Sequence, residues 1–108
     1  MVMKHIVMFR RRADVAGQPG LEAQLVERMR ALDREITFVR GWKVSANELD
    51  RAICWDYLLE STFDDRQALE QYLPHPAHVA LITDLKQYFD WAAVDYTDYT
   101  DYTDSPAA

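Results

Sequence analysis

The sequence contains few of the residues on which several common kinds of function depend. Its single cysteine, Cys54, excludes an internal disulfide bond. It has only three glycines, and no glycine-rich phosphate loop, C-x-x-C pair or nucleophile elbow occurs anywhere in the chain. Lysine and arginine number 12 against 18 acidic residues, which gives a formal net charge of −6. Nucleic-acid binding, which requires clustered basic side chains, is therefore not expected.

Long apolar runs are also missing. No stretch is long enough to cross a bilayer, so we expect no membrane partner. The opening residues, MVMKHIVMFRRR, place their charges after the apolar stretch, the reverse of a secretory signal peptide. These absences predict a cytoplasmic protein. The basic run Arg10–Arg12 has two interpretations that stay open: solvated residues that follow a strand, or a tether for an anionic group of a substrate.

What is present is typical of one globular domain. The chain has 108 residues, of which 49% are hydrophobic and 28% are charged. Residues 2–10 alternate in polarity and are rich in strand formers, which predicts a β-strand. His5 and Val7 then share one face, while Ile6 and Met8 lie on the other. Because both faces are largely apolar, we expect helices to cover one side of the sheet and something else to cover the other.

The rest of the chain predicts a ferredoxin-like arrangement. Two strands joined by a short turn indicate an antiparallel hairpin, and Asp64 and Asp65 offer an N-cap for the helix that follows. Pro74 and Pro76 must interrupt that helix, and Pro76 suits the first turn of the next one. The expected elements are helix 21–33, strands 39–47 and 52–63, helix 66–73, helix 76–89 and strand 91–96. This β-α-β-β-α-β order, with the second helix broken in two, defines an α+β fold with an antiparallel sheet.

The end of the chain differs from the rest in composition. We expect the domain to span residues 1–96 and residues 97–108 to form an acidic, low-complexity C-terminal tail. The segment DYTDYTDYTD, residues 95–104, repeats with a period of three. It is either an extension without chemistry or a polyproline-like coil that aligns its three tyrosines on one side. In the second case the coil would be held against a neighbouring surface.

The stretch QYLPHPAHV carries the residues of greatest chemical interest. His78 shares a helical stripe with Ile82 and Leu85, and Tyr72 lies on the inner face of the preceding helix. With His5 on the first strand, one phenol and two imidazoles are expected to converge between sheet and helices. Two explanations stand. The rings either satisfy one another and the broken backbone, or they line a pocket as an acid/base pair.

A metal site is a third interpretation of the same stretch. His75 and His78 have helical i, i+3 spacing, but no carboxylate or thiolate lies within the same turn. Zinc sites use at least three protein ligands. We therefore expect no metal here, and no cofactor elsewhere in the chain.

Three motifs resemble one known family. KHIVMF at the start, YLPHPAHV before the last helix and VDY in the last strand are similar to the stress-responsive dimeric α/β-barrel (Dabb) family, over residues 2–96. Members of that family are homodimers of ferredoxin-like subunits, whose sheets pack face to face into a barrel. The resemblance implies a homodimer, with Ile6, Met8, Leu58 and Val94 toward the partner. A dimer of this kind would explain the two apolar faces of the first strand.

The resemblance also implies a candidate site. A plant polyketide cyclase of this family closes a linear polyketide by aldol chemistry without a cofactor. Its catalytic tyrosine and histidine match Tyr72 and His78, because the motif is Y-x-x-H-P-A-H in both. Its first-strand pocket histidine matches His5, and a further pocket histidine falls on Tyr57, where this sequence departs from the pattern. Both positions are implied to bind substrate, whereas His75, next to a proline, is implied to be a structural break.

Three classes of function follow. The first is cofactor-independent acid/base catalysis, as a cyclase or lyase, on a small apolar carbonyl or aromatic ligand, with His78 as base and Tyr72 as hydrogen-bond donor. The second is a non-enzymatic, stress-associated homodimer or ligand-binding protein. The third is a cofactorless monooxygenase, although the Asn–Trp–His arrangement of those enzymes is not found. A cavity of roughly 300 Å³ or more at Tyr72 and His78 would favour ligand chemistry, and a filled core the second class.

Overall fold

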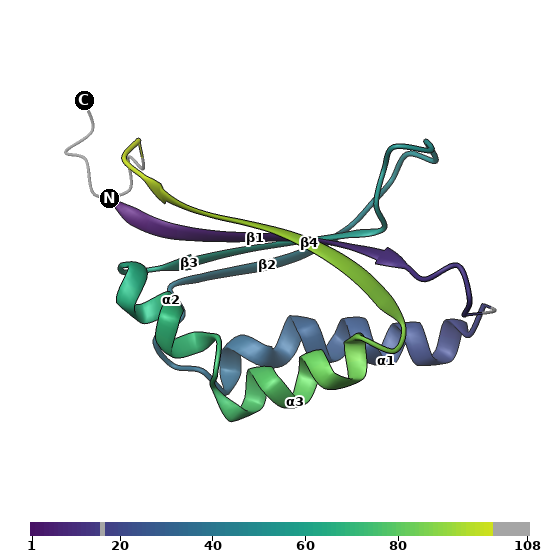
Figure 1. The fold of residues 1–108 in the computed structure, drawn as a ribbon, viewed down its shortest axis with the longest axis horizontal. Coiled ribbons are helices and arrows are strands. Elements are labelled where there is room, and N and C mark those ends of the chain that lie inside the picture. The colour runs from purple at the N-terminus through teal and green to yellow at the C-terminus, as the bar shows by residue number, and fades with distance from the viewer. Residues whose placement is uncertain (16, 101–108) are drawn as a thin grey trace.

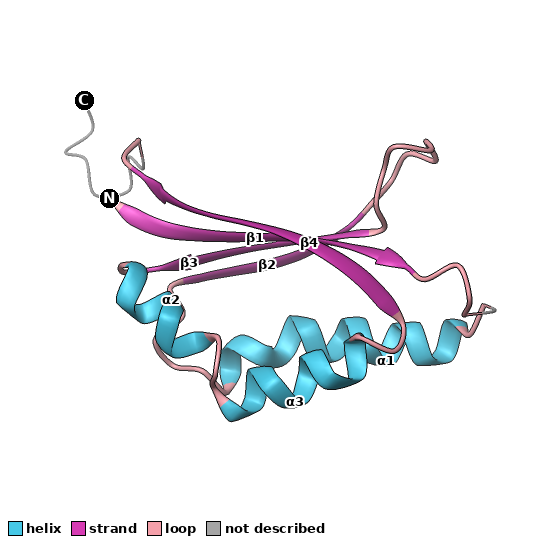
Figure 2. Ribbon diagram, viewed as in Figure 1, coloured by secondary structure: helices cyan, strands magenta, loops and turns pink. Residues whose placement is uncertain are grey.

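The computed structural model describes residues 1–15 and 17–100. In this part of the chain a four-stranded antiparallel sheet carries its helices on one face only (Figures 1 and 2). The elements are β1 (Val2–Arg11), α1 (Pro19–Ala31), the short 3-10 helix η1 (Leu32–Arg34), β2 (Gly41–Ala46), β3 (Tyr57–Phe63), α2 (Arg66–Tyr72), α3 (Pro76–Leu85) and β4 (Phe89–Asp98). The predicted ferredoxin-like α+β fold, with its second helix broken in two, is confirmed.

The sheet has the strand order β2-β3-β1-β4, so β1 lies inside it and β4 forms one edge. β1 pairs with β3 from Met3↔Phe63 to Phe9↔Tyr57, and with β4 along its whole length. The side chains of β1 alternate as predicted: His5, Val7 and Phe9 are buried under the helices, while Met8 on the opposite face is 42% exposed.

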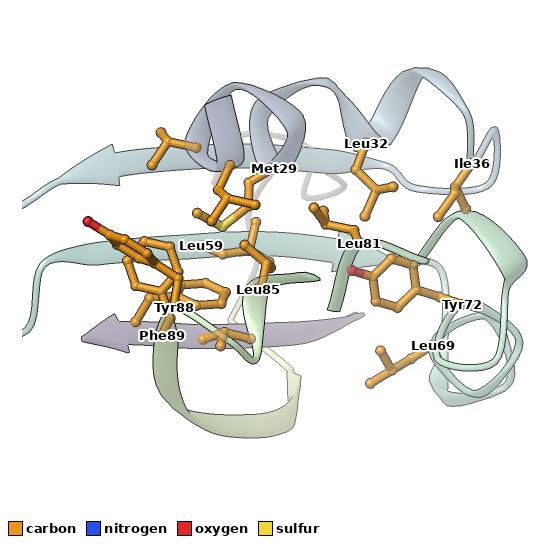
Figure 3. Packing of buried hydrophobic residues seen from close by; sticks show 14 of the residues in the cluster. Met29, Leu32, Ile36, Leu59, Leu69, Tyr72, Leu81, Leu85, Tyr88 and Phe89 are labelled. Carbon is orange, nitrogen blue, oxygen red and sulfur yellow. The ribbon is translucent and has the colours of Figure 1, made fainter. Parts of the chain in front are cut away.

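The core lies between this sheet and the three α-helices (Figure 3). Leu25 and Met29 of α1 meet Leu81 and Leu85 of α3 over the sheet, and all four side chains are buried. Helical spacing alone accounts for these pairs, because residues three or four positions apart share one face of a helix.

Most boundaries lie close to those predicted, but two, the start of β3 and the end of α3, differ by several residues. β3 begins at Tyr57 instead of residue 52, and Ile53, predicted to lie in that strand, is 74% exposed in a long loop. The loop is closed where the amide of Asn47 donates to the carbonyl of Asp56, 2.8 Å away. At the other end of the chain, Phe89 does not end a helix but begins β4, where it pairs with Arg11. In both places the boundary is set by where a neighbouring strand is available for pairing, and the local sequence pattern does not decide it.

Side-chain caps begin both α2 and α3. The Asp65 carboxylate accepts a hydrogen bond from the amide of Ala68 at 2.9 Å, and Pro76 occupies the first turn of α3. His75 is the N-cap of α3, since its Nδ1 accepts from the amide of Ala77 at 3.1 Å. The His75 imidazole therefore has a structural partner within its own turn.

The sheet face opposite the helices, called the open face below, is not covered by any described element (Figure 1). It carries the apolar side chains Ile6, Met8, Leu58, Val94 and Tyr96. Val94 is 63% exposed and Tyr96 44%. No helix in the described residues is long and apolar enough to span a bilayer.

The acidic repeat begins inside the sheet. β4 runs on to Asp98, so the first copy of the repeat is paired strand and not polyproline-like coil. Residues 101–108, which make up most of the predicted tail, lie outside the described residues.

Candidate functional site

A cavity of about 290 Å³ lies between the sheet and the helices, close to the volume expected of a small-molecule site. Its wall is mostly apolar, with contributions from all four strands and from α1, α2 and α3. Four polar side chains interrupt that wall: His5, Tyr72, His78 and Asp95. Three of these were predicted to converge here from the sequence.

Tyr72 is the last residue of α2 and is only 1% exposed. Its ring packs against Phe63, with centroids 5.0 Å apart, and against His78 at 4.4 Å. Figure 3 shows its hydroxyl pointing inward, toward Leu81. Burial raises the pKa of the phenol well above its ordinary value, so the hydroxyl stays protonated and can act as a hydrogen-bond donor.

His78 lies in the first turns of α3 and is half-buried. Its Nδ1 is 2.7 Å from the carbonyl oxygen of Leu73, the residue that caps α2. Because a carbonyl only accepts, Nδ1 carries the hydrogen and Nε2 keeps its lone pair. Burial lowers the pKa of His78 below 6.5, and the nearby His5 and His75 rings add to this, although the bond to Leu73 opposes it. The ring is therefore neutral at pH 7 and suited to accept a proton.

His5 is 6% exposed and is held on two sides. Its Nδ1 contacts the carboxylate of Asp95, which lies directly opposite it on β4. Its backbone carbonyl accepts a hydrogen bond from the hydroxyl of Ser61 on β3 at 2.7 Å. The imidazole meets the Tyr72 ring edge-on, with centroids 5.8 Å apart.

Asp95 is the site residue that sequence reasoning missed. In the sequence it is the first residue of the acidic repeat and the middle residue of the VDY motif, and neither pattern predicts a contact with His5. The antiparallel register of β1 and β4 places it beside His5, 90 positions away in the chain. The predicted fold already places the last strand beside the first. The sequence does not determine which residues of the two strands lie opposite each other, so it could not place Asp95 beside His5.

The reactive atoms of the site face the cavity. Every side-chain nitrogen or oxygen that is sealed from solvent within the described residues has a hydrogen-bond partner. The Tyr72 hydroxyl and the Nε2 atoms of His5 and His78 have no partner among those residues. The three atoms are therefore not sealed, and they open onto the cavity that their residues line. A ligand or water in the cavity can bond to all three.

Tyr57 is not brought to this cavity. It lies on the helix-covered face, but its ring packs against Phe89, with centroids 5.8 Å apart, and its hydroxyl donates to Glu22 at 2.5 Å. Tyr88 also donates to Glu22, at 2.8 Å, and Arg11 forms an ion pair with the same carboxylate. The Arg11 hydrogen bond is the main reason that the pKa of Glu22 falls to about 2. Burial raises the pKa of Tyr57 to about 12.

The basic run predicted as a possible anion tether is engaged within the chain. Arg11 binds Glu22, and Arg12 forms an ion pair with Asp14 at 3.0 Å. The guanidinium of Arg10 stacks over Trp55, 4.6 Å from the ring centroid. No group of three or more His, Cys, Asp or Glu side chains that could hold a metal occurs in the described residues.

Comparison with known proteins gives consistent matches. The chain is 34% identical over 95 residues to an uncharacterized protein of Streptomyces coelicolor, an alignment covering 88% of this chain and 98% of that protein. A dimeric protein of unknown function with a ferredoxin-like fold from Bacteroides fragilis is 31% identical, with a TM-score of 0.78 over 90% of this chain and 96% of that one.

Two solved enzymes share the fold at lower identity. The hydroxynitrile lyase of Passiflora edulis is 17% identical, with a TM-score of 0.77 over 92% of this chain and 95% of that one. SnoaB, a cofactor-independent oxygenase from Streptomyces nogalater, is 15% identical, with a TM-score of 0.70 over 90% of this chain and 92% of that one. At these identities the likeness concerns the fold alone.

The family model of the stress responsive A/B barrel domain matches residues 3–98, nearly the whole described chain. Together with the order of elements and the Y-x-x-H-P-x-H corner, this match shows that the chain belongs to the stress responsive A/B barrel domain (Dabb) family.

Proposed function

We propose that this protein is a cofactor-independent acid/base catalyst that acts on a small, largely apolar carbonyl compound in the cavity. The observation that carries the proposal is the Tyr72–His78 pair. A protonated phenol and a neutral imidazole lie side by side on an apolar cavity, and each has a reactive atom without a hydrogen-bond partner among the described residues. A filled core would have used those atoms in internal hydrogen bonds.

In the proposed reaction, Nε2 of His78 takes a proton from the carbon next to a substrate carbonyl. The electron pair of that C–H bond moves into an enolate, and the Tyr72 hydroxyl donates a hydrogen bond to its oxygen. The enolate carbon then attacks a second carbonyl of the same molecule, which forms a C–C bond and an alkoxide. The alkoxide takes the proton back from His78, so atoms and charges balance. The reverse sequence is a retro-aldol lyase reaction.

Such a base contributes about 10²–10⁴-fold to the rate. The remainder would come from holding a flexible substrate in a reactive conformation between the aromatic walls. His5 would orient polar substrate atoms through Nε2, because Asp95 engages its Nδ1. Asp95 thus acts through His5, as a positioning residue.

A homodimer is part of the proposal. The open face groups Ile6, Met8, Leu58 and Val94, the residues expected at a dimer contact, and exposed apolar patches of this kind are typical of interfaces. The relative from Bacteroides fragilis is described as dimeric. Pairing of two open faces would leave the cavity, which lies on the helix side, accessible in each subunit.

Exchange of substrate hydrogens tests the chemistry without knowledge of the natural substrate. Phenylacetone in deuterated buffer would be followed by NMR for loss of its α-hydrogens. We expect the protein to accelerate exchange, and His78→Ala and Tyr72→Phe each to lower that acceleration about 100-fold. Tyr88→Phe, which changes an equally buried tyrosine at the other end of the core, should leave it unchanged.

Measurements of phenylacetone binding and of oxygen consumption, made beside the exchange experiment, separate the competing functions. If phenylacetone binds but exchanges no faster than in buffer, the protein is a ligand-binding protein and the catalytic proposal is wrong. Oxygen consumption on addition of an electron-rich phenol would instead indicate monooxygenase chemistry, for which Trp42 and Trp91 line the cavity.

A further inference from the structure

A second hollow, which we call the outer groove, lies next to the cavity. The outer groove has a volume of about 490 Å³ and runs between α2 and the C-terminal half of β4. It shares Leu73 and Asp95 with the cavity, so the two spaces meet at these residues. Leu73 is 40% exposed and the Asp95 side chain 41%, which identifies this junction as a mouth of the cavity.

The cavity and the outer groove differ in polarity. The described residues that line the cavity include neither lysine nor arginine. The outer groove has Arg66, Glu70 and Thr97 on its walls, and Arg66 is already paired with Glu70 at 2.7 Å. With Asp95 at the junction, two carboxylates and one guanidinium line the groove. The groove can therefore hydrogen-bond a polar group, but its charge opposes an anionic one.

We propose that the site takes an elongated, uncharged ligand, with its apolar reacting end in the cavity and its neutral polar end in the outer groove. This inference rests on the proposed function, because it assumes that the cavity holds the reacting group. The Arg66–Glu70 pair offers donors and acceptors to the polar end, and the Thr97 hydroxyl, which donates to the Met3 sulfur at 3.7 Å, can accept a hydrogen bond there. Amide or hydroxyl groups fit this surface, and a carboxylate or phosphate does not.

Three matched probes test the proposal by calorimetric titration of the full-length protein. The short probe, 4-propylphenol, fits the cavity alone. The two long probes lengthen the propyl chain of the same phenol by a five-carbon acyl group. One is 8-(4-hydroxyphenyl)octanoic acid, which ends in a free carboxylate, and the other is its N-methylamide. We expect the amide to bind about tenfold more tightly than 4-propylphenol, since it adds contacts in the groove. The carboxylate should bind about tenfold more weakly than the amide, because Glu70 and Asp95 repel it.

Two substitutions and one control test whether these effects arise in the groove. Thr97→Trp fills the groove and should remove the advantage of the amide while leaving the affinity for 4-propylphenol unchanged. Thr83→Trp is the matched control, because Thr83 is an exposed residue of α3 that lines neither space. It should change neither the advantage of the amide nor the affinity for 4-propylphenol. Glu70→Gln should reduce the difference in binding affinity between the carboxylate probe and the amide probe.

The outcomes are separable. An amide that binds no better than 4-propylphenol, or a carboxylate that binds as tightly as the amide, overturns the elongated, uncharged ligand but leaves the proposed catalytic site standing. If none of the three phenols binds, the cavity is not a ligand site, and the proposed function fails together with this inference.

Discussion

Removal of the Tyr72 hydroxyl should not weaken the fold, even though the side chain is 1% exposed. Most buried tyrosine hydroxyls are held by a protein partner, and their loss costs stability. The Tyr72 hydroxyl has none among the described residues, so Tyr72→Phe removes no internal hydrogen bond. It also removes a polar oxygen from a cavity wall that is mostly apolar. We expect the free energy of unfolding to stay the same or to rise by up to about 1 kcal/mol.

Tyr88 supplies the matched comparison. It is 2% exposed, and its hydroxyl donates to the Glu22 carboxylate at 2.8 Å. Tyr88→Phe deletes the same single oxygen but breaks a bond to a charged acceptor, so it should cost about 1–2 kcal/mol. The difference between the two variants, about 1–3 kcal/mol, compares a tyrosine hydroxyl that has an internal partner with one that has none.

Urea unfolding followed by tryptophan fluorescence measures both variants against the parent protein at one protein concentration. If the unfolding free energy falls with urea concentration at the same slope in all three proteins, only stability has changed. If Tyr72→Phe loses as much stability as Tyr88→Phe, the Tyr72 hydroxyl has a structural partner and the argument for a reactive phenol collapses. A stable Tyr72→Phe variant without catalytic exchange would be the typical result of a site that trades stability for function.

Three further outcomes are expected. The pKa of Glu22 in the folded protein, about 2, lies below its ordinary value of 4.5, so the carboxylate stabilises the fold above pH 4.5 and its contribution is lost as the pH falls from 4.5 toward 2; Glu22→Gln should remove this part of the pH dependence of urea unfolding. Because the pKa of His78 is lowered, the acidic limb of the kcat/KM profile should lie below pH 6.5, and a limb above 6.5 would exclude this ring as the base. Met8→Lys on the open face should shift the protein from dimer to monomer in sedimentation experiments, whereas a monomeric parent protein at micromolar concentration would contradict the dimer.

Much of the fold could be predicted because it depends on local patterns. The alternation in β1 assigned each face correctly, and Pro74 and Pro76 marked the break between α2 and α3. The start of β3 could not be found in the same way, since residues 52–56 have the composition of a strand. Only the partner positions on β1 and β2, which begin opposite Tyr57, decide where pairing starts.

The candidate site was predictable to the same extent. His5, Tyr72 and His78 lie on faces that helix and strand periodicity define, and all three line the cavity. Asp95 depends on the register between strands at opposite ends of the chain, which no local pattern contains. Tyr57 lies on the predicted, helix-covered face of the sheet but does not reach the cavity. Its hydroxyl instead donates to Glu22 of α1 at the other end of the core.

The Glu22 carboxylate joins parts of the chain that are far apart in sequence. It is bonded by Arg11 at the end of β1, Tyr57 at the start of β3 and Tyr88 in the turn before β4. Figure 3 shows Tyr88 and Tyr72 at opposite ends of the core. The Glu22 interactions therefore stabilise the end of the core that lies away from Tyr72. Leu73 and Ile82 line the cavity near Tyr72 and make none of these bonds, so substitutions there can change the shape of the cavity while the Glu22 interactions stay intact.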